Sequence, residues 1–173
     1  ISAGTTISHA FAYTAHLLYD SLHLYQFGLP EEAFKLALTG YHQLLKKQLP
    51  RKPDILCIAD FSQSSNKKRF YIIDINKAKL LFQTWVAHGR NSGQEFANSF
   101  SNRPATNKSS LGFYLTMNTY YGSNGYSLKL RGLEKGVNDN AERREIVMHS
   151  ANYVSERFLA SNGYLGRSQG CPA

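Results

Sequence analysis

The sequence predicts an α+β fold: an N-terminal helical hairpin followed by a mainly antiparallel, β-sandwich-like domain. Up to residue 50, apolar side chains recur at spacings of three and four, as in amphipathic helices. From residue 54 the apolar period falls to two, which is typical of half-buried strands. Hydrophobic residues make up 42% of the 173 residues, enough for a buried core without disulfides.

Two helices and a linker are expected in residues 1–53. The first helix covers about residues 8–25 and ends at Gly28. The second begins at Pro30, carries acidic residues in its first turn and ends in two lysines, Lys46 and Lys47. We therefore expect residues 1–53 to form one domain, with a second domain over residues 54–173.

The second domain is expected to consist of strands joined by polar loops. Runs of β-branched and aromatic residues predict strands at residues 56–59, 70–75, 80–88, 112–119, 126–130 and 145–148. A short helix is expected over residues 153–160. The polar loop at residues 89–110 is unusually long, and such loops commonly line or cover a functional site.

The net charge of +8 favours polyanionic partners in general. The cations are scattered rather than grouped in a run, and no nucleic-acid motif accompanies them, so we expect no nucleic-acid partner. An anionic envelope polymer fits equally well, and so does an ordinary solvated surface. We expect no membrane-spanning helix, because no apolar stretch reaches 18 residues, and the chain shown carries no signal peptide.

Three histidines, His9, His16 and His23, recur every seven residues and are expected to share one face of the first helix. Metal ligands on a helix need the closer spacing of four residues. We therefore expect a polar or pH-sensitive helix face here, and no metal or other cofactor in the protein.

The two cysteines lie in contrasting surroundings. Cys57 falls in an apolar run, where a small buried hydrophobe fits, although a disulfide between the two remains open. Cys171 is surrounded by glycine and polar residues, which suits a nucleophile. Its thiol needs a base, because a free thiol is only slightly ionised at neutral pH. His149, at the end of a predicted strand, is the best candidate, with His88 second; a structural strand-end histidine is the alternative.

The stretch His149-Ser150, followed by Ser168-Gln169-Gly170-Cys171, resembles the catalytic motif of the YkuD-type murein L,D-transpeptidases. Further stretches that resemble this family extend the likeness over residues 55–173. The resemblance implies that residues 54–173 form an L,D-transpeptidase catalytic domain. Because the chain stops two residues after Cys171, we also expect a final C-terminal segment beyond Ala173.

The resemblance implies a reaction on peptidoglycan stem peptides. Cys171 attacks the L-centre carbonyl of diaminopimelate in a tetrapeptide, releases D-Ala, and passes the acyl group to an amine, forming a 3→3 cross-link. His149 is the implied base, and the Ser150 carbonyl orients its imidazole. The N–H groups of Gly170 and Cys171 are implied to hold the oxyanion. No cofactor is needed.

The same resemblance implies a periplasmic or secreted location, and we expect a monomer whose N-terminal helices can receive an envelope protein partner. Gln169 stands where the family often has histidine, which puts in doubt any role of that histidine near the oxyanion. Candidate substrate contacts are Arg167, Ser168, Gln169, His88, Arg90, Asn91 and Tyr153. Surface solvation is the alternative for Arg90, and packing is the alternative for Tyr153.

Two other functions remain open. An L,D-carboxypeptidase differs only in using water as the acceptor. A non-catalytic peptidoglycan-binding module is the alternative outside enzymes, with the basic surface giving affinity for the wall.

Overall fold

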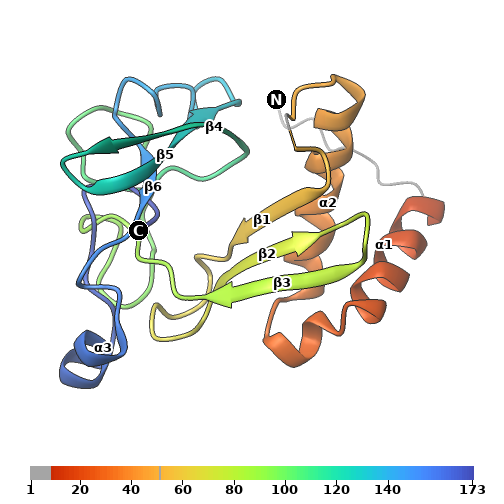
Figure 1. Cartoon of the computed structure of the whole chain (residues 1–173), viewed down its shortest axis with the longest axis horizontal. Helices are drawn as coiled ribbons and strands as arrows, with labels where there is room; N and C mark the ends of the chain where they lie inside the picture. The colour runs from red at the N-terminus through yellow and green to blue at the C-terminus, as the bar shows by residue number, and fades with distance from the viewer. Residues whose placement is uncertain (1–8, 51) are drawn as a thin grey trace. The chain divides into compact units, whose positions relative to one another are not determined.

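The computed structural model describes residues 9–50 and 52–173, with side chains from Tyr13 onward. Contacts divide the chain into two compact units (Figure 1). The first unit contains the residues up to 58 together with residues 71–83. The second contains residues 59–70 and 84–173. This division does not fall at residue 53, and a separate domain over residues 1–53 stays a prediction.

The first unit packs helices against a sheet. Its helices are α1 (His9–Ser21), the 3-10 helix η1 (Leu24–Phe27) and α2 (Glu31–Lys46). The sheet has the order β1-β2-β3, built from β1 (Ile55–Ala59), β2 (Phe70–Asp74) and β3 (Lys79–Thr84). Helical residues such as Phe34 and Leu38 share one buried core with strand residues such as Tyr71 and Ile73.

The first helix is shorter than expected, and the three-histidine face is therefore wrong. α1 ends at Ser21, and His23 has a φ of 50°, in the left-handed region. The tighter turn of η1 lets the chain reverse and bury Leu24 and Leu29 in the same core. His16 contacts Asp20 and Glu31 instead, and the side chain of His9 lies outside the described part.

The second unit carries an antiparallel sheet of order β4-β5-β6: β4 (Tyr114–Gly122), β5 (Gly125–Gly132) and β6 (Val147–His149). A tight turn joins β4 and β5. In the register of β5 and β6, Ser127 lies opposite His149. The short helix α3 (Glu156–Asn162) follows, with Ser155 as its N-cap. Two connections therefore fix His149: its place in β6 and the pairing with β5.

The third strand ends four residues earlier than the sequence predicted. Beyond Thr84 the backbone groups find other partners within the second unit. The Val86 carbonyl accepts two hydrogen bonds from the buried guanidinium of Arg69, and Ala87 pairs with Ala173. His88 consequently lies in an irregular segment rather than at a strand end.

The mixed α+β class is confirmed, with two small antiparallel sheets. The sandwich-like packing of the sheets and the helical hairpin stay predictions. Over the described residues, we find no helix with both the length and the apolar character needed to span a membrane.

Candidate active site

The thiol of Cys171 lies against the main chain that leads into β6. Its sulfur accepts a hydrogen bond from the backbone N–H of Val147 at 3.5 Å and donates to the Glu145 carbonyl at 3.6 Å. Cys171 is 8% exposed, and burial raises the pKa of its thiol. The Val147 hydrogen bond and the charge of Arg144 pull the pKa in the opposite direction. At rest the group is therefore a protonated thiol that needs a base.

His149 is oriented by its neighbour in the chain. Its Nδ1 lies 2.9 Å from the Ser150 carbonyl oxygen, which can only accept a hydrogen bond. Nδ1 therefore carries the proton, and Nε2 is left with a lone pair. His149 and Val147 are two residues apart on one strand, so they project from the same face about 7 Å apart. The backbone N–H of Val147 lies in the plane of the sheet, so the Cys171 sulfur lies at the edge of β6, two residues before His149, and the hydrogen bonds described for the thiol do not include His149.

Serine hydroxyls hold the segment before the thiol in place. Ser168 is buried, and its hydroxyl accepts from the Gly170 N–H at 3.0 Å and donates to the Cys171 carbonyl at 2.6 Å. Ser109, from the long loop, donates to the Gly170 carbonyl at 3.0 Å and accepts from the Gly89 N–H at 3.0 Å. Ser92 in turn accepts from the Ser109 N–H. Both sides of the Gly170-Cys171 segment are thereby fixed by neutral hydrogen bonds.

The two glycines at this point allow a close backbone approach. A Cβ on Gly89 would lie 2.4 Å from the Asn107 carbonyl oxygen and 2.9 Å from the Gly170 Cα. Gly170 has a φ of 125°, which L side chains rarely adopt, and a Cβ there would meet the Lys108 carbonyl oxygen at 2.9 Å. Any side chain at either position would push the long loop away from the nucleophile.

The structure does not bring His88 to an open surface. The side chain is fully buried, and its Nδ1 accepts from Arg69 at 2.8 Å while Nε2 lies 3.3 Å from the Gly93 carbonyl oxygen. Burial, followed by the charge of Arg69, lowers the pKa of His88 to about 4. Its carbonyl accepts from the Ser168 N–H. His88 thus contacts the segment that leads to Cys171 through its backbone.

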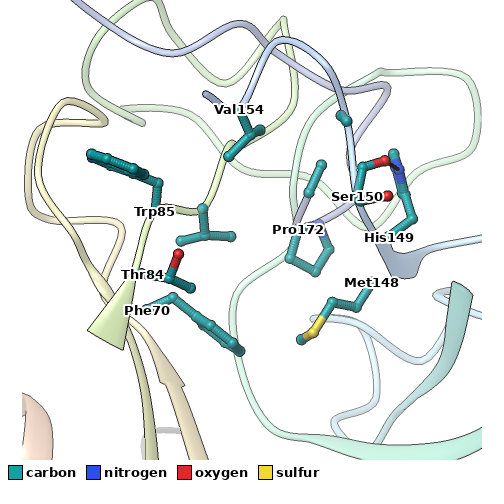
Figure 2. Close-up of a pocket in the computed structure, with 11 residues that line it drawn as sticks. Phe70, Thr84, Trp85, Met148, His149, Ser150, Val154 and Pro172 are labelled. Carbon is teal, nitrogen blue, oxygen red and sulfur yellow. Dashed lines mark hydrogen bonds between the residues drawn. The ribbon is translucent and has the colours of Figure 1, made fainter. Parts of the chain in front are cut away.

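A cavity of about 300 Å³ opens beside the imidazole, and all its lining residues belong to the second unit. It is mostly apolar. Figure 2 shows Phe70, Thr84 and Trp85 on one side and Met148 with His149 on the other. The full lining is Phe70, Thr84, Trp85, Val86, Met148, His149, Ser150, Ala151, Val154, Pro172 and Ala173. The pocket therefore adjoins His149 and the residues directly after Cys171.

The other predicted contact residues are spread around this centre. Arg167, Gln169, Arg90 and Asn91 are exposed, and Asn91 donates its side-chain amide to the Thr106 carbonyl at 2.9 Å. Arg167 reaches the Gly93 carbonyl at 3.5 Å.

Tyr153 packs against Gly166, in the segment that leads to Cys171. A Cβ added to Gly166 would lie 2.3 Å from its Cβ, and its carbonyl accepts from the Gly166 N–H. Burial and the Cys171 charge raise the pKa of Tyr153, which places its ring in the surroundings of the thiol. Substrate contact by any of these side chains stays a prediction.

Sequence reasoning missed the residues that support the nucleophile. Ser109 falls in a stretch that resembles the family, but its bonds to Gly89 and Gly170 join segments far apart in sequence. Arg144 counted only as one of many scattered cations, and nothing in its neighbourhood distinguished it from Arg143. Cys57, expected to be buried, is an exposed free thiol, because its side chain points away from the core of the first unit.

The described residues contain no group of three or more histidine, cysteine or carboxylate side chains that could hold a metal ion. Nucleophilic catalysis by a thiol and an imidazole needs no such group.

The family profile of the L,D-transpeptidase catalytic domain matches residues 26–173. The chain belongs to this family. No curated protein and no solved structure matches it in the corresponding searches. The match places β6, the long loop and the C-terminal Gly170-Cys171 segment within one L,D-transpeptidase catalytic domain, and it begins within the residues predicted as a separate N-terminal domain.

Proposed function

We propose that this protein is a peptidoglycan L,D-transpeptidase whose nucleophile is Cys171 and whose general base is His149. The observation that carries the proposal is the hydrogen bond that brings Cys171 to the edge of β6, two residues before His149. The sulfur lies on the Val147 N–H, and the oriented imidazole follows two residues later. A rotation of the Cys171 side chain away from Glu145 is the motion that brings the thiol to the free Nε2.

Acylation begins when Nε2 of His149 takes the thiol proton and the sulfur attacks the L-centre carbonyl of diaminopimelate in a tetrapeptide stem. The carbonyl becomes a tetrahedral oxyanion. When it collapses, the C–N bond breaks, the imidazolium gives its proton to the departing D-Ala amine, and a thioester to Cys171 remains. An amine of a neighbouring stem then attacks the thioester, loses its proton to His149 and regenerates the thiol. The product is a 3→3 cross-link.

The Cys171 N–H is the first candidate for stabilising the oxyanion, since it donates to no acceptor among the described residues. The Gly170 N–H donates to Ser168, so it serves the oxyanion only after release from that hydroxyl. The pocket beside His149 is where we place the apolar part of the substrate.

The same proposal includes the setting of the enzyme. We place it in the periplasm or cell wall, acting as a monomer, with the N-terminal helices available to an envelope protein partner. Its architecture would be a helical hairpin domain over residues 1–53 and a β-sandwich-like catalytic domain over residues 54–173. Carbapenems are expected to acylate Cys171.

Incubation with disaccharide tetrapeptides tests the proposal. Chromatography and mass spectrometry should detect cross-linked dimers and free D-Ala, and Cys171→Ala should abolish both. Tripeptides without dimers would replace the transferase with a carboxypeptidase. Binding to peptidoglycan without either product would leave only the non-catalytic module and would overturn the proposed chemistry.

A further inference from the structure

Arg144 is tied to the long loop by one guanidinium. Its Nη1 donates to the Ser101 carbonyl at 2.6 Å and to the Ser110 hydroxyl, and its Nη2 donates to the Lys108 carbonyl at 2.5 Å. A longer contact of 3.5 Å joins Nη2 to Thr106. The side chain thus fixes residues 101–110 at several points, as only a planar fork of donors can.

All of these acceptors are neutral oxygens. Among the described residues, no carboxylate lies within 4.0 Å of Arg144, because every ion pair found there involves other residues. Burial lowers the pKa of this guanidinium, and an arginine side chain keeps its charge in proteins. A positive charge without an acidic partner is therefore held in a partly buried position.

The same guanidinium lies beside the nucleophile segment. A Cβ on Gly170 would come within 3.3 Å of Nη2 and 2.9 Å of the Lys108 carbonyl oxygen that Nη2 binds. The neighbouring Ser109 hydroxyl donates to the Gly170 carbonyl. The loop that Arg144 holds is thus the surface on which Gly170 rests, one residue before the thiol.

The charged groups around the sulfur favour a specific role for this cation. Arg144 lowers the pKa of Cys171, whereas Glu145 raises it, and the phenol of Tyr153 also faces the thiol. Of these three groups, only Arg144 is positive at neutral pH. His149 lies two residues further along β6 and acts as the base in the proposed function.

We propose that Arg144 is a positioning residue for Cys171: its fork holds loop 101–110 against Gly170, and its unpaired charge stabilises the thiolate. This inference rests on Cys171 being the nucleophile of the proposed function. The two contributions are separable, because lysine keeps the charge but loses the fork, and glutamine loses the charge.

The test is the rate of Cys171 alkylation by iodoacetamide as a function of pH. It is carried out in a Cys57→Ser background, so that the second free thiol of the chain adds no alkylation of its own. Arg144→Gln should move the inflection to higher pH by about one unit and slow alkylation at pH 7 by roughly tenfold. Arg144→Lys should keep the inflection of the parent protein while its turnover of tetrapeptide substrate falls at least tenfold.

Arg143→Gln is the matched control, since this neighbouring arginine is exposed, and it should change neither measurement. An Arg144→Gln inflection identical to that of the parent would overturn the electrostatic role. Full peptide turnover by Arg144→Lys would overturn the positioning role. If Arg144→Gln does not fold, the inflection of Arg144→Lys decides the electrostatic part, and a shift as large as one unit contradicts it.

Alkylation does not depend on transpeptidation. A protein that shows the predicted pH shifts but never forms peptide products would refute the proposed function and leave standing only the electrostatic part of the inference, the stabilisation of the thiolate by Arg144.

Discussion

The sulfur of Cys171 lies 3.5 Å from the backbone nitrogen of Val147, two residues before His149 on β6. This contact joins the C-terminal Gly170-Cys171 segment to the strand that carries the candidate base. Because the short strand β6 carries both this N–H and His149, the contact brings thiol and imidazole into one small region. The predictions below concern this region and the segments that support it.

Removal of the base should slow acylation without disturbing the fold. His149 is at the end of a short strand and orients itself through the Ser150 carbonyl, so His149→Ala leaves no buried group unpaired. We expect the acylation rate of Cys171 to fall by roughly 100- to 10,000-fold. Single-turnover mass spectrometry measures this rate, with His16→Ala as a control histidine in the first unit. An unchanged rate would mean that another group takes the thiol proton.

Filling the pocket should block the peptide but not a small reagent. Val154 lines the cavity, and a Val154→Trp variant would occupy much of its volume. The KM for tetrapeptide substrate should rise at least tenfold, while the rate of iodoacetamide alkylation of Cys171 should stay within a factor of two. The matched control is Val137→Trp at an exposed position. Equal effects of both variants on KM would exclude the cavity as the substrate site.

Adding a single methyl group at Gly89 should lower the stability of the protein, because other backbone segments approach this glycine closely. In Gly89→Ala the new Cβ meets backbone atoms of Asn107, Ser109 and Gly170, none of which is the end of a flexible side chain. We expect a loss of about 3 kcal/mol in the free energy of unfolding, at the upper end of overpacking effects. Gly136→Ala is the comparison, because it has open space and only the strain of a positive φ, which costs about 1 kcal/mol. Urea unfolding of both variants measures the two losses. A larger loss for Gly136→Ala than for Gly89→Ala would contradict the close packing described around Gly89.

The stability of the protein should fall in mild acid because His88 is buried as a neutral group. Its folded pKa of about 4 lies below the ordinary histidine value of about 6.5, so the unfolded chain binds more protons between these values. The contribution of neutral His88 to the free energy of unfolding is complete above pH 6.5 and is lost as the pH falls toward 4. Both charged neighbours that disfavour protonation, Arg69 and Arg167, are positive throughout.

We expect wild type to lose about 1–3 kcal/mol more than His88→Gln between pH 7 and pH 4.5, measured by urea unfolding. Glutamine can still accept from Arg69 and donate to Gly93. The exposed His16→Gln serves as the control and should follow wild type. Parallel pH profiles for wild type and His88→Gln would show that His88 is protonated as easily as in the unfolded chain.

Local periodicity predicted helices and strands well where the element buries one face along its whole length. The second helix and the strand ending at His149 lie close to the expected positions, because their apolar patterns match a single buried face. The apolar run of Trp85, Val86 and Ala87 predicts that the third strand continues to residue 88. Residues 86–88 are buried for a different reason, by Arg69 and by pairing with the C-terminal segment, which no local pattern reveals.

The sequence predicted which residue types carry the chemistry of the site. It did not predict the residues that hold them in position. A cysteine among polar residues and glycines, and a histidine at the end of a predicted strand, stand out from the local sequence. The Ser109–Gly170 hydrogen bond and the Arg144 fork join residues that lie 34 to 61 positions apart. Such contacts depend on how the long loop folds back, and a single sequence carries no signal for this path.

The identity of the nucleophile is the central claim, and one intact-mass measurement tests it most directly. The Cys57→Ser protein is incubated with a carbapenem at neutral pH, and peptide mapping locates any adduct. The account predicts that one drug mass is added, on Cys171, and that no adduct forms on Cys171→Ala. A folded protein that stays unmodified, or an adduct that persists in Cys171→Ala, would contradict it.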